Sequence, residues 1–257
     1  MDAGIPIARL DLRVEVPLDR RVANAQACLA RKLPAFTELP DYAFGRIRVA
    51  ALVSGGPSAG ESLDKIREFK TVFACGSVHD FLITQGIIPK YCVIFDPGAE
   101  HAMFYRRPHP DVTYLVCATC DPAVFDALAG QRVHVWAPYD DTPDELYGEG
   151  TPRVNGGSSV TLRTIPLAHV LGYREQHLFG FDCCHLNGNE HAYEHGARGD
   201  RITVSFMGKQ FSTTPQLLQQ SQEFLRMYTD HQHMLMCKVA GDGLIATIMR
   251  ESVCNYG

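Results

Sequence analysis

Residues 49–66 read VAALVSGGPSAGESLDKI, and this stretch decides the fold of the chain. Its first residues continue an apolar run that begins at residue 47. Such a run is typical of a strand buried on both faces of a parallel sheet. A Gly-Gly-Pro-Ser sequence follows, and residues 61–69 then have the pattern of a helix. A strand that ends in glycines directly before a helix predicts the opening of an alternating strand-and-helix fold.

The same alternation continues along the chain. Further strands are expected at residues 71–76, 91–96, 113–119, 132–137, 175–182 and 233–240. Helices are expected at residues 19–33, 78–85, 122–128, 158–171 and 214–228. This pattern predicts an α/β fold with a mostly parallel sheet and helices on both faces, in which ligands bind beyond the carboxyl ends of the strands.

The chain divides into an N-terminal extension, residues 1–47, and a main domain, residues 48–257. Periodicity is weak in the extension apart from one helical stretch, and we expect this segment to pack on the main domain. Within the main domain, residues 138–153 are rich in proline, glycine and acidic residues. Irregular loops of this length in compact domains often serve as lids, so we expect this loop to close over an acceptor.

The composition is that of a globular protein without a broad basic surface. A net charge of −5 predicts against tight non-specific binding to nucleic acid. Because the sequence has neither an apolar run of membrane-spanning length nor a leader pattern at its start, we expect a cytoplasmic protein with no membrane association. The nine cysteines lie largely in apolar runs, which favours reduced thiols over a disulfide framework.

Unusual residues follow three of the expected strands, and we expect all three ends to face one cleft. The loop after the first strand comprises Ser54, Gly55, Gly56, Pro57 and Ser58. Its glycine pair permits a sharp turn and a close ligand, and the amides of the following helix favour an anion. We therefore expect this loop to bind a phosphate, with an ordinary turn as the alternative. On this interpretation, Gly56→Val abolishes nucleotide binding without unfolding the domain.

A second glycine pair opens the helix expected at residues 158–171. This loop comprises Asn155, Gly156, Gly157 and Ser158. We expect it to bind another part of the same ligand, because two such loops in one α/β chain favour a nucleotide more than either does alone. The alternative is an ordinary helix cap, for which serine is a preferred residue.

Acidic residues and histidines follow the other two strand ends. Asp96 is expected to hold a ribose hydroxyl or a metal ion, unless it only begins an Asp-Pro-Gly turn. Asp182 precedes His185 and His191, either of which can act as a general base or stabilise a leaving phosphate. The alternative for the histidines is a polar surface loop. A zinc site from Cys183 and its neighbours is a weaker alternative, because the ligand spacing is poor.

Four stretches in chain order resemble the MptE-like domain, namely VSGGPS, GIIPKYCVIFDPG, VNGGSSVTLRTIPLAHVLGYREQHLFGFD and HAY. That domain is named for an archaeal 6-hydroxymethylpterin diphosphokinase. It also occurs in motility accessory factors, which are glycosyltransferases that modify flagellin. Its layout is similar to that of bacterial sialyltransferases that use CMP-sugars. The resemblance covers roughly residues 49–228 and implies a Rossmann-like domain that holds a nucleotide at the first glycine loop.

The resemblance also concerns individual positions. It implies nucleotide contacts for both glycine loops and for the acidic residue after the third strand, and it matches Asp182 and His191 to an acidic and a histidine position. Lys90 stands where the family usually has Asp. Residues 208–214, where the sialyltransferases carry a catalytic histidine, contain none, and Cys184 stands in place of their leaving-group tyrosine. Sialyl transfer by that mechanism is therefore not expected.

We predict a nucleotide-dependent transferase whose donor is a nucleotide-activated sugar, with His191, His185 and Asp182 as catalytic residues. One alternative is a diphosphokinase that acts on a pterin-like alcohol with ATP and requires Mg²⁺ on Asp96 and Asp182. Another is a non-catalytic nucleotide-binding module. The expected partner is a small-molecule nucleotide donor. The acceptor stays unidentified, neither nucleic acid nor membrane is expected as a partner, and a homo-oligomer is left open.

Overall fold

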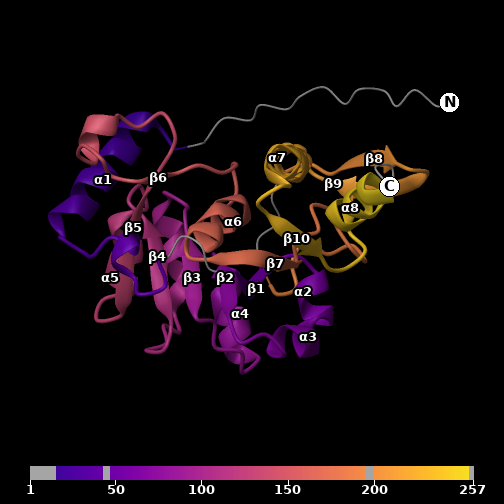
Figure 1. Ribbon diagram of the computed structural model, residues 1–257, viewed down its shortest axis with the longest axis horizontal. Coiled ribbons are helices and arrows are strands. Elements are labelled where there is room, and N and C mark those ends of the chain that lie inside the picture. The colour runs from indigo at the N-terminus through magenta and orange to yellow at the C-terminus, as the bar shows by residue number, and fades with distance from the viewer. Residues whose placement is uncertain (1–15, 43–46, 195–198, 255–257) are drawn as a thin grey trace.

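A computed structural model describes residues 16–42, 47–194 and 199–254 of the chain. Its centre is an eight-stranded sheet in the order β10-β7-β1-β2-β3-β4-β5-β6, in which the neighbouring strands pair in parallel (Figure 1). The strands of this sheet are β1 (Arg48–Val53), β2 (Val72–Cys75), β3 (Tyr91–Ile94), β4 (Thr113–Cys117), β5 (Arg132–Pro138), β6 (Arg153–Val154), β7 (Tyr173–Phe179) and β10 (Met236–Val239).

Helices connect most of these strands. The α-helices are α1 (Leu18–Ala30), α2 (Ser58–Glu61), α3 (Leu63–Arg67), α4 (Val78–Thr84), α5 (Pro122–Ala127), α6 (Val160–Val170), α7 (Pro215–His231) and α8 (Leu244–Cys254). Short 3-10 helices are η1 (Phe36–Glu38), η2 (Ala99–Tyr105) and η3 (Asp144–Leu146). Across the described part of the chain, every helix is too short or too polar to traverse a bilayer.

The strand order reverses at the boundary between β1 and β7. From β1 to β6 the chain moves steadily toward one edge of the sheet, whereas β7 returns to the other side of β1 and β10 extends that side. Because crossovers between parallel strands are right-handed, this reversal places α2 to α5 on one face and α6 and α7 on the other. The contact between α6 and α7 agrees with this arrangement. The predicted α/β sheet with helices on both faces is confirmed.

Most of the expected elements are present, because the strands are apolar runs that the sheet buries. Residues 50–53 of β1, for example, are all fully buried. The helix expected at residues 61–69 is instead a pair of short helices, α2 and α3, with Ser62 between them. Two elements near the C-terminus were not predicted, a hairpin and the helix α8.

The hairpin pairs β8 (Ile202–Phe206) with β9 (Lys209–Thr213) in antiparallel fashion. Its sequence ITVSF alternates apolar and polar residues, and Met207 and Gly208 form its turn with φ values of 49° and 74°. The apolar side of the hairpin packs on α7 and α8 over a small second core. The buried members of this core are Cys184, Phe211, Leu218, Leu244 and Ile248.

The described part of the N-terminal extension, residues 16–42, packs against the β4 and β5 side of the molecule. Asn24 of α1 donates from Nδ2 to the carbonyls of Pro97 and Thr119, at 3.2 and 3.0 Å. These carbonyls follow β3 and β4, so α1 covers loops at the carboxyl edge of the sheet. The other residues of the 1–47 extension lie outside the described ranges, and the domain division itself stays a prediction.

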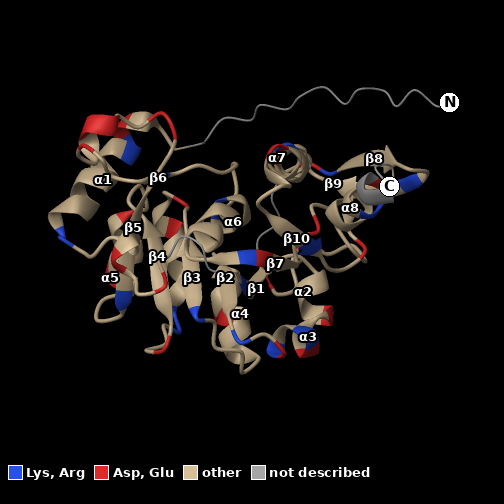
Figure 2. Ribbon diagram, in the orientation of Figure 1, with Lys and Arg blue, Asp and Glu red and all other residues tan. Residues whose placement is uncertain are grey.

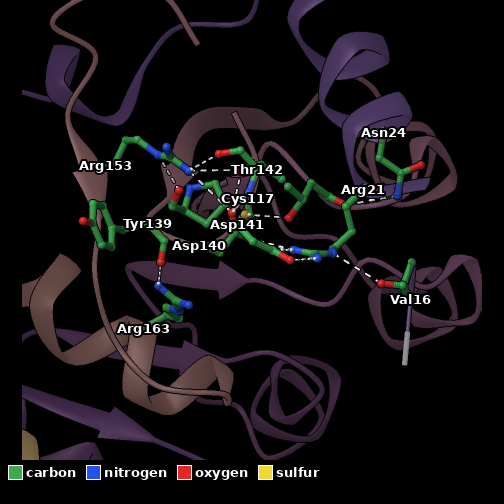
Figure 3. A network of polar contacts seen from close by, with 12 residues as sticks. Val16, Arg21, Asn24, Cys117, Tyr139, Asp140, Asp141, Thr142, Arg153 and Arg163 are labelled. Atoms are coloured by element: carbon green, nitrogen blue, oxygen red, sulfur yellow. Dashed lines mark hydrogen bonds and ion pairs between the residues drawn. The ribbon is translucent and has the colours of Figure 1, made fainter. Parts of the chain in front are cut away.

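The acidic loop between β5 and β6 folds back on α1. Arg21 donates from Nη1 and Nη2 to the carboxylate of Asp141, at 2.6 and 2.9 Å, and from Nη1 to Asp140 at 3.2 Å (Figure 3). Arg153 donates from Nε to the Pro138 carbonyl at 2.7 Å. Figure 2 shows the acidic residues gathered beside α1 in this region. The loop is therefore fastened to the N-terminal helix.

Candidate functional site

A cavity of about 180 Å³ lies at the carboxyl edge of the sheet, where the strand order reverses. The expected strand ends all reach it. Its lining includes Ser54, Gly55 and Gly56 after β1, Asp96 after β3 and Asp182 after β7. Ser158 and His191 line it as well. In α/β sheets this crevice is the usual ligand site, so the topology and the sequence signals point to the same place.

The first glycine loop presents only part of itself to this cavity. Pro57 and Ser58 lie behind the lining, and Ser58 is buried. The Ser58 N–H donates to Asp182 Oδ2 at 3.0 Å, and the Gly56 N–H donates to the Gly180 carbonyl at 2.8 Å. Protein acceptors therefore hold the two amides that were expected to face a phosphate. A ligand can approach this loop from the side of Ser54, Gly55 and Gly56.

Gly56 is needed for packing. A Cβ at this position would lie 2.5 Å from Asp182 Oδ2 and would press against the Gly180 carbonyl, which is backbone and cannot swing away. The expectation that Gly56→Val removes nucleotide binding while the domain stays folded does not fit this geometry. The substitution would instead force β1 and β7 apart.

In the second loop, an acidic side chain again occupies the start of the helix. Glu223 of α7 accepts from the N–H and from the Oγ of Ser158, at 2.7 and 2.8 Å. Ser159 caps α6 through its Oγ, which accepts from the Leu162 N–H at 3.4 Å. The preceding residues Asn155, Gly156 and Gly157 do not belong to the cavity lining. Of the expected second loop, only Ser158 faces the cavity.

Asp182 is the most enclosed acidic residue of the cavity, with an exposed fraction of 3%. One carboxylate oxygen accepts from Ser58, whereas the other, Oδ1, is buried with no hydrogen-bond partner among the described residues. Burial raises the pKa of this carboxyl above its ordinary value, although the hydrogen bonds from Ser58 act in the opposite direction. An unpartnered buried oxygen at a cavity wall is suited to contact a ligand hydroxyl.

Asp96 and Asp182 lie at opposite ends of the cavity. They follow β3 and β7, which are separated by β1 and β2, or about 14 Å across a sheet. This separation does not fit a single Mg²⁺ shared by both carboxylates. Within the described ranges, no cluster of three or more histidine, cysteine or acidic side chains is arranged to hold a metal ion. Cys183 and its neighbour Cys184, considered for zinc, both follow β7 and are buried.

The two candidate histidines have different positions. His191 lines the cavity and packs beside Gly55, whose carbonyl accepts from the Ala192 N–H at 2.9 Å. His185 is buried behind the wall. Its Nε2 lies 3.5 Å from Glu190 Oε2, and Glu190 in turn lines the cavity. His185 therefore reaches the cavity only through Glu190.

One carboxylate and one imidazole of the cavity lining, those of Glu190 and His101, were not predicted. Glu190 directly precedes the His-Ala-Tyr stretch. Its position next to a predicted site histidine is the sequence feature that could have identified it. His101 lies on η2, with its Nδ1 3.6 Å from Asp96 Oδ2, and it lines the cavity beside that carboxylate. Its signal was weaker, because no helix was predicted between the strands that end at residue 96 and begin at residue 113.

The charge of the lining is unusual for a phosphate site. Asp96, Asp182 and Glu190 all line the cavity, whereas the described residues contribute no lysine or arginine to it. Arg163 is buried and donates from Nη1 to the Val154 carbonyl at 2.8 Å and to the Tyr139 carbonyl at 3.3 Å, and Figure 3 shows the second of these contacts. Residues 139–152 are likewise absent from the lining, so this position does not support a loop that closes over an acceptor.

Comparisons with known proteins agree with this fold. A family model described as 6-hydroxymethylpterin diphosphokinase MptE-like matches residues 22–188. The solved structure of MAf glycosyltransferase from Magnetospirillum magneticum AMB-1 is similar, with a TM-score of 0.67 and 18% identity over 90% of this chain. The chain spans only 38% of that protein, and at this identity the likeness concerns the fold. No curated protein sequence matches the chain.

Proposed function

The chain belongs to the 6-hydroxymethylpterin diphosphokinase MptE-like family, and from this premise we propose that it is a nucleotide-dependent transferase that uses a nucleotide-activated sugar. The family match confirms the resemblance, and the first three of the four sequence stretches lie within its residues 22–188. The observation that carries the proposal is the cavity at the strand reversal. Its lining gathers part of the first loop (Ser54, Gly55 and Gly56), Ser158 of the second, Asp96, Asp182 and His191. A nucleotide is the ligand class that such a crevice most often binds.

The proposed binding mode follows the order of the strands. We place the donor phosphate beside Ser54 and Gly55, which line the cavity next to His191. His191 packs beside Gly55 and stabilises the leaving phosphate. Asp96, at the β3 end, holds ribose hydroxyls, and the Oδ1 of Asp182 contacts the transferred group at the β7 end.

The lining favours a donor with little phosphate charge. Three carboxylates line the cavity, and its described residues include no lysine or arginine to balance a di- or triphosphate. A sugar joined to a nucleoside monophosphate brings a single phosphate charge and suits this environment. We therefore rank sugar transfer above diphosphate transfer from ATP, which in this lining would depend on Mg²⁺. The alternative without catalysis requires nucleotide binding with no turnover.

Calorimetric titration tests the proposal. The ligands are CMP, CDP, UDP, GDP, ADP and ATP, each with and without Mg²⁺. We expect metal-independent binding with preference for a cytidine or uridine nucleotide. Gln216→Trp, on the cavity wall, should weaken this binding at least about tenfold, while Arg226→Trp, on the same helix but outside the lining, should not.

Each other outcome has a defined meaning. Binding of ATP only with Mg²⁺ would replace sugar transfer by the diphosphokinase alternative. If Gln216→Trp leaves the nucleotide affinity unchanged, the nucleotide binds outside this cavity. Failure of all six nucleotides to bind would overturn the transferase proposal.

A further inference from the structure

Glu190 is placed on the cavity wall by a tight turn. Leu186 and Asn189 exchange two backbone hydrogen bonds, each N–H donating to the other's carbonyl at 3.0 and 2.9 Å. Between them, Asn187 and Gly188 adopt left-handed φ values of 52° and 79°. This turn reverses the chain directly before Glu190, whose side chain is 14% exposed and lines the cavity. The backbone therefore fixes where this carboxylate lies.

The same turn places Glu190 against a buried imidazole. His185 Nε2 lies 3.5 Å from Glu190 Oε2, and the His185 side chain is only 3% exposed. The other ring nitrogen, Nδ1, lies 3.2 Å from the Ser212 carbonyl, which also accepts from the His185 N–H at 2.7 Å. Because Nδ1 faces a carbonyl, it carries a proton, and the ring orientation is set. The result is a carboxylate in the cavity backed by an oriented imidazole.

The other acidic residues of the cavity are less suited to accept a proton. Asp182 already accepts from the Ser58 amide through Oδ2, and the proposed function assigns its Oδ1 to the transferred group. Asp96 lies beside His101 at the β3 end, which the proposed function assigns to ribose. Glu190 is held instead beside His185, in the segment that follows β7 as Asp182 does, and the proposed function places the transferred group at the β7 end.

We propose that Glu190 is the general base that takes the proton of the acceptor hydroxyl, and that His185 is its positioning residue. This inference rests on the proposed transferase function. Sequence reasoning assigned the proton transfer to a histidine, whereas the geometry gives it to the carboxylate that separates His185 from the cavity.

The step balances for sugar transfer. The acceptor O–H gives its proton to a Glu190 oxygen, and the acceptor oxygen forms a bond to the anomeric carbon of the donor. The bond from that carbon to the phosphate oxygen breaks, and its electron pair leaves with the nucleoside monophosphate. Water serves as a slow acceptor in the same scheme, with the free sugar as product, so donor hydrolysis reports on the base.

The experiment measures release of CMP from CMP-N-acetylneuraminic acid by wild type and variants. Glu190→Gln should lower the turnover rate about 100-fold while the Kd for CMP stays within about twofold. Glu190→Asp should retain part of the rate, because it keeps the base. Glu194→Gln is the matched control, an exposed glutamate four residues along the chain, and should behave as wild type.

The positioning role of His185 has its own readout. His185→Asn should lower turnover about tenfold with CMP affinity unchanged, and should displace the acidic limb of the pH–rate profile. A role confined to packing would change thermal stability and leave that limb in place. Far-ultraviolet circular dichroism of each variant separates loss of the base from loss of the fold.

The outcomes separate this inference from the function on which it rests. If wild type releases CMP and Glu190→Gln does so within about threefold, Glu190 is not the base and the transferase proposal stands. If wild type binds CMP but releases none from the donor, transfer of this sugar fails. In that case ATP with 6-hydroxymethylpterin is the second probe, in which the same base would deprotonate the pterin alcohol. Turnover of neither donor overturns both the function and the base.

Discussion

At the scale of single residues, the glycines of the site make room for one carboxylate. A Cβ on Gly56 would lie 2.5 Å from Asp182 Oδ2, and a Cβ on Gly243 would lie 2.8 Å from the Asp182 Cα. A Cβ on Gly241 would approach Oδ1 to 3.5 Å. The backbone is thus packed around Asp182 from three sides. The glycine pair does mark the loop that lines the cavity. Gly56, however, is required by the packing of the chain around Asp182, whether or not a ligand binds.

Burial of Asp182 predicts a pH-dependent stability. Burial raises the pKa of this carboxyl, so the free energy of unfolding falls as the pH rises from the ordinary carboxyl pKa through the raised one. Asp182→Asn keeps an acceptor for the Ser58 amide and removes the ionisation. We expect it to raise the free energy of unfolding by about 1 kcal/mol at pH 7 and to change little at pH 3. Urea denaturation at both pH values measures this, and an equal gain at both would contradict it.

The crowding at Gly56 predicts a large loss of stability from one methyl group. Gly56→Ala should lower the free energy of unfolding by about 3 kcal/mol, because the neighbouring Gly180 carbonyl is backbone and cannot give way. Gly60→Ala is the control. Its Cβ would meet only Ala192 at an ordinary 3.5 Å, and alanine favours the helix. Denaturant titration compares the two, and equal stabilities would show that the loop adapts.

At the scale of elements, α1 is fastened to the acidic loop through one buried arginine. The Arg21 side chain is 7% exposed and contacts Asp140 and Asp141 together. Its neighbour Arg20 is 60% exposed and pairs with Asp121 alone. These adjacent residues carry the same charge on the same helix in different environments, so they form a natural pair for measurement.

Arg21→Ala should detach α1. We expect a loss of about 3 kcal/mol, because two carboxylates lose a buried partner, and faster amide exchange confined to residues 16–42 and the acidic loop. Arg20→Ala should cost less than about 1 kcal/mol, as exposed ion pairs do. Hydrogen-exchange mass spectrometry locates the effect. Similar costs for both substitutions would mean that the loop is held by other contacts.

Lys90 shows how a departure from the family pattern is accommodated. It pairs with Asp41 of the N-terminal extension, which also pairs with Arg48 at 2.8 Å. Burial acts to raise the pKa of Asp41, but the hydrogen bonds from Lys90, Tyr91 and Arg48 hold it well below its ordinary value. A pairing between segments so far apart in the chain was not readable from the sequence.

The strands could be predicted because burial on both faces leaves a continuous apolar run. The β8–β9 hairpin was missed although its alternation was visible, since the pattern spans only five residues in each strand. Glu190 and His101 were missed for a different reason. Each acquires its position from a turn or a short helix in an irregular segment, and such geometry leaves little periodic signal.

At the scale of the whole molecule, the strand topology predicts where the cavity lies. It does not predict which side chains line the cavity or what charge they carry. The strand reversal places the crevice beyond β1 and β7, as expected for any such sheet. The acidic lining arises from the segments after β3 and β7, which supply Asp96, Asp182 and Glu190. The sequence predicts where the strands end, but it does not say which loop residues then face inward.

Ligand binding to the cavity should stabilise the entire fold, because the site is built from elements on both sides of the sheet. A nucleotide at about 100 times its Kd should add about 2.7 kcal/mol and raise the Tm by about 5–10 °C. Differential scanning fluorimetry measures the shift, with Gln216→Trp as the variant that should lose it. A shift that persists in this variant would place the ligand elsewhere.

The carboxylate of Glu223 competes with any anionic ligand for Ser158, at the start of α6. This carboxylate occupies the amide and hydroxyl of Ser158, and Gln219 donates to its other oxygen at 2.9 Å. A phosphate that binds at Ser158 has to displace this carboxylate, which is part of the same chain and therefore always present. The measured affinity for the ligand is reduced by the free energy of that displacement. Because Glu223 belongs to α7, a phosphate that displaced it from Ser158 would also break a contact between α7 and the start of α6.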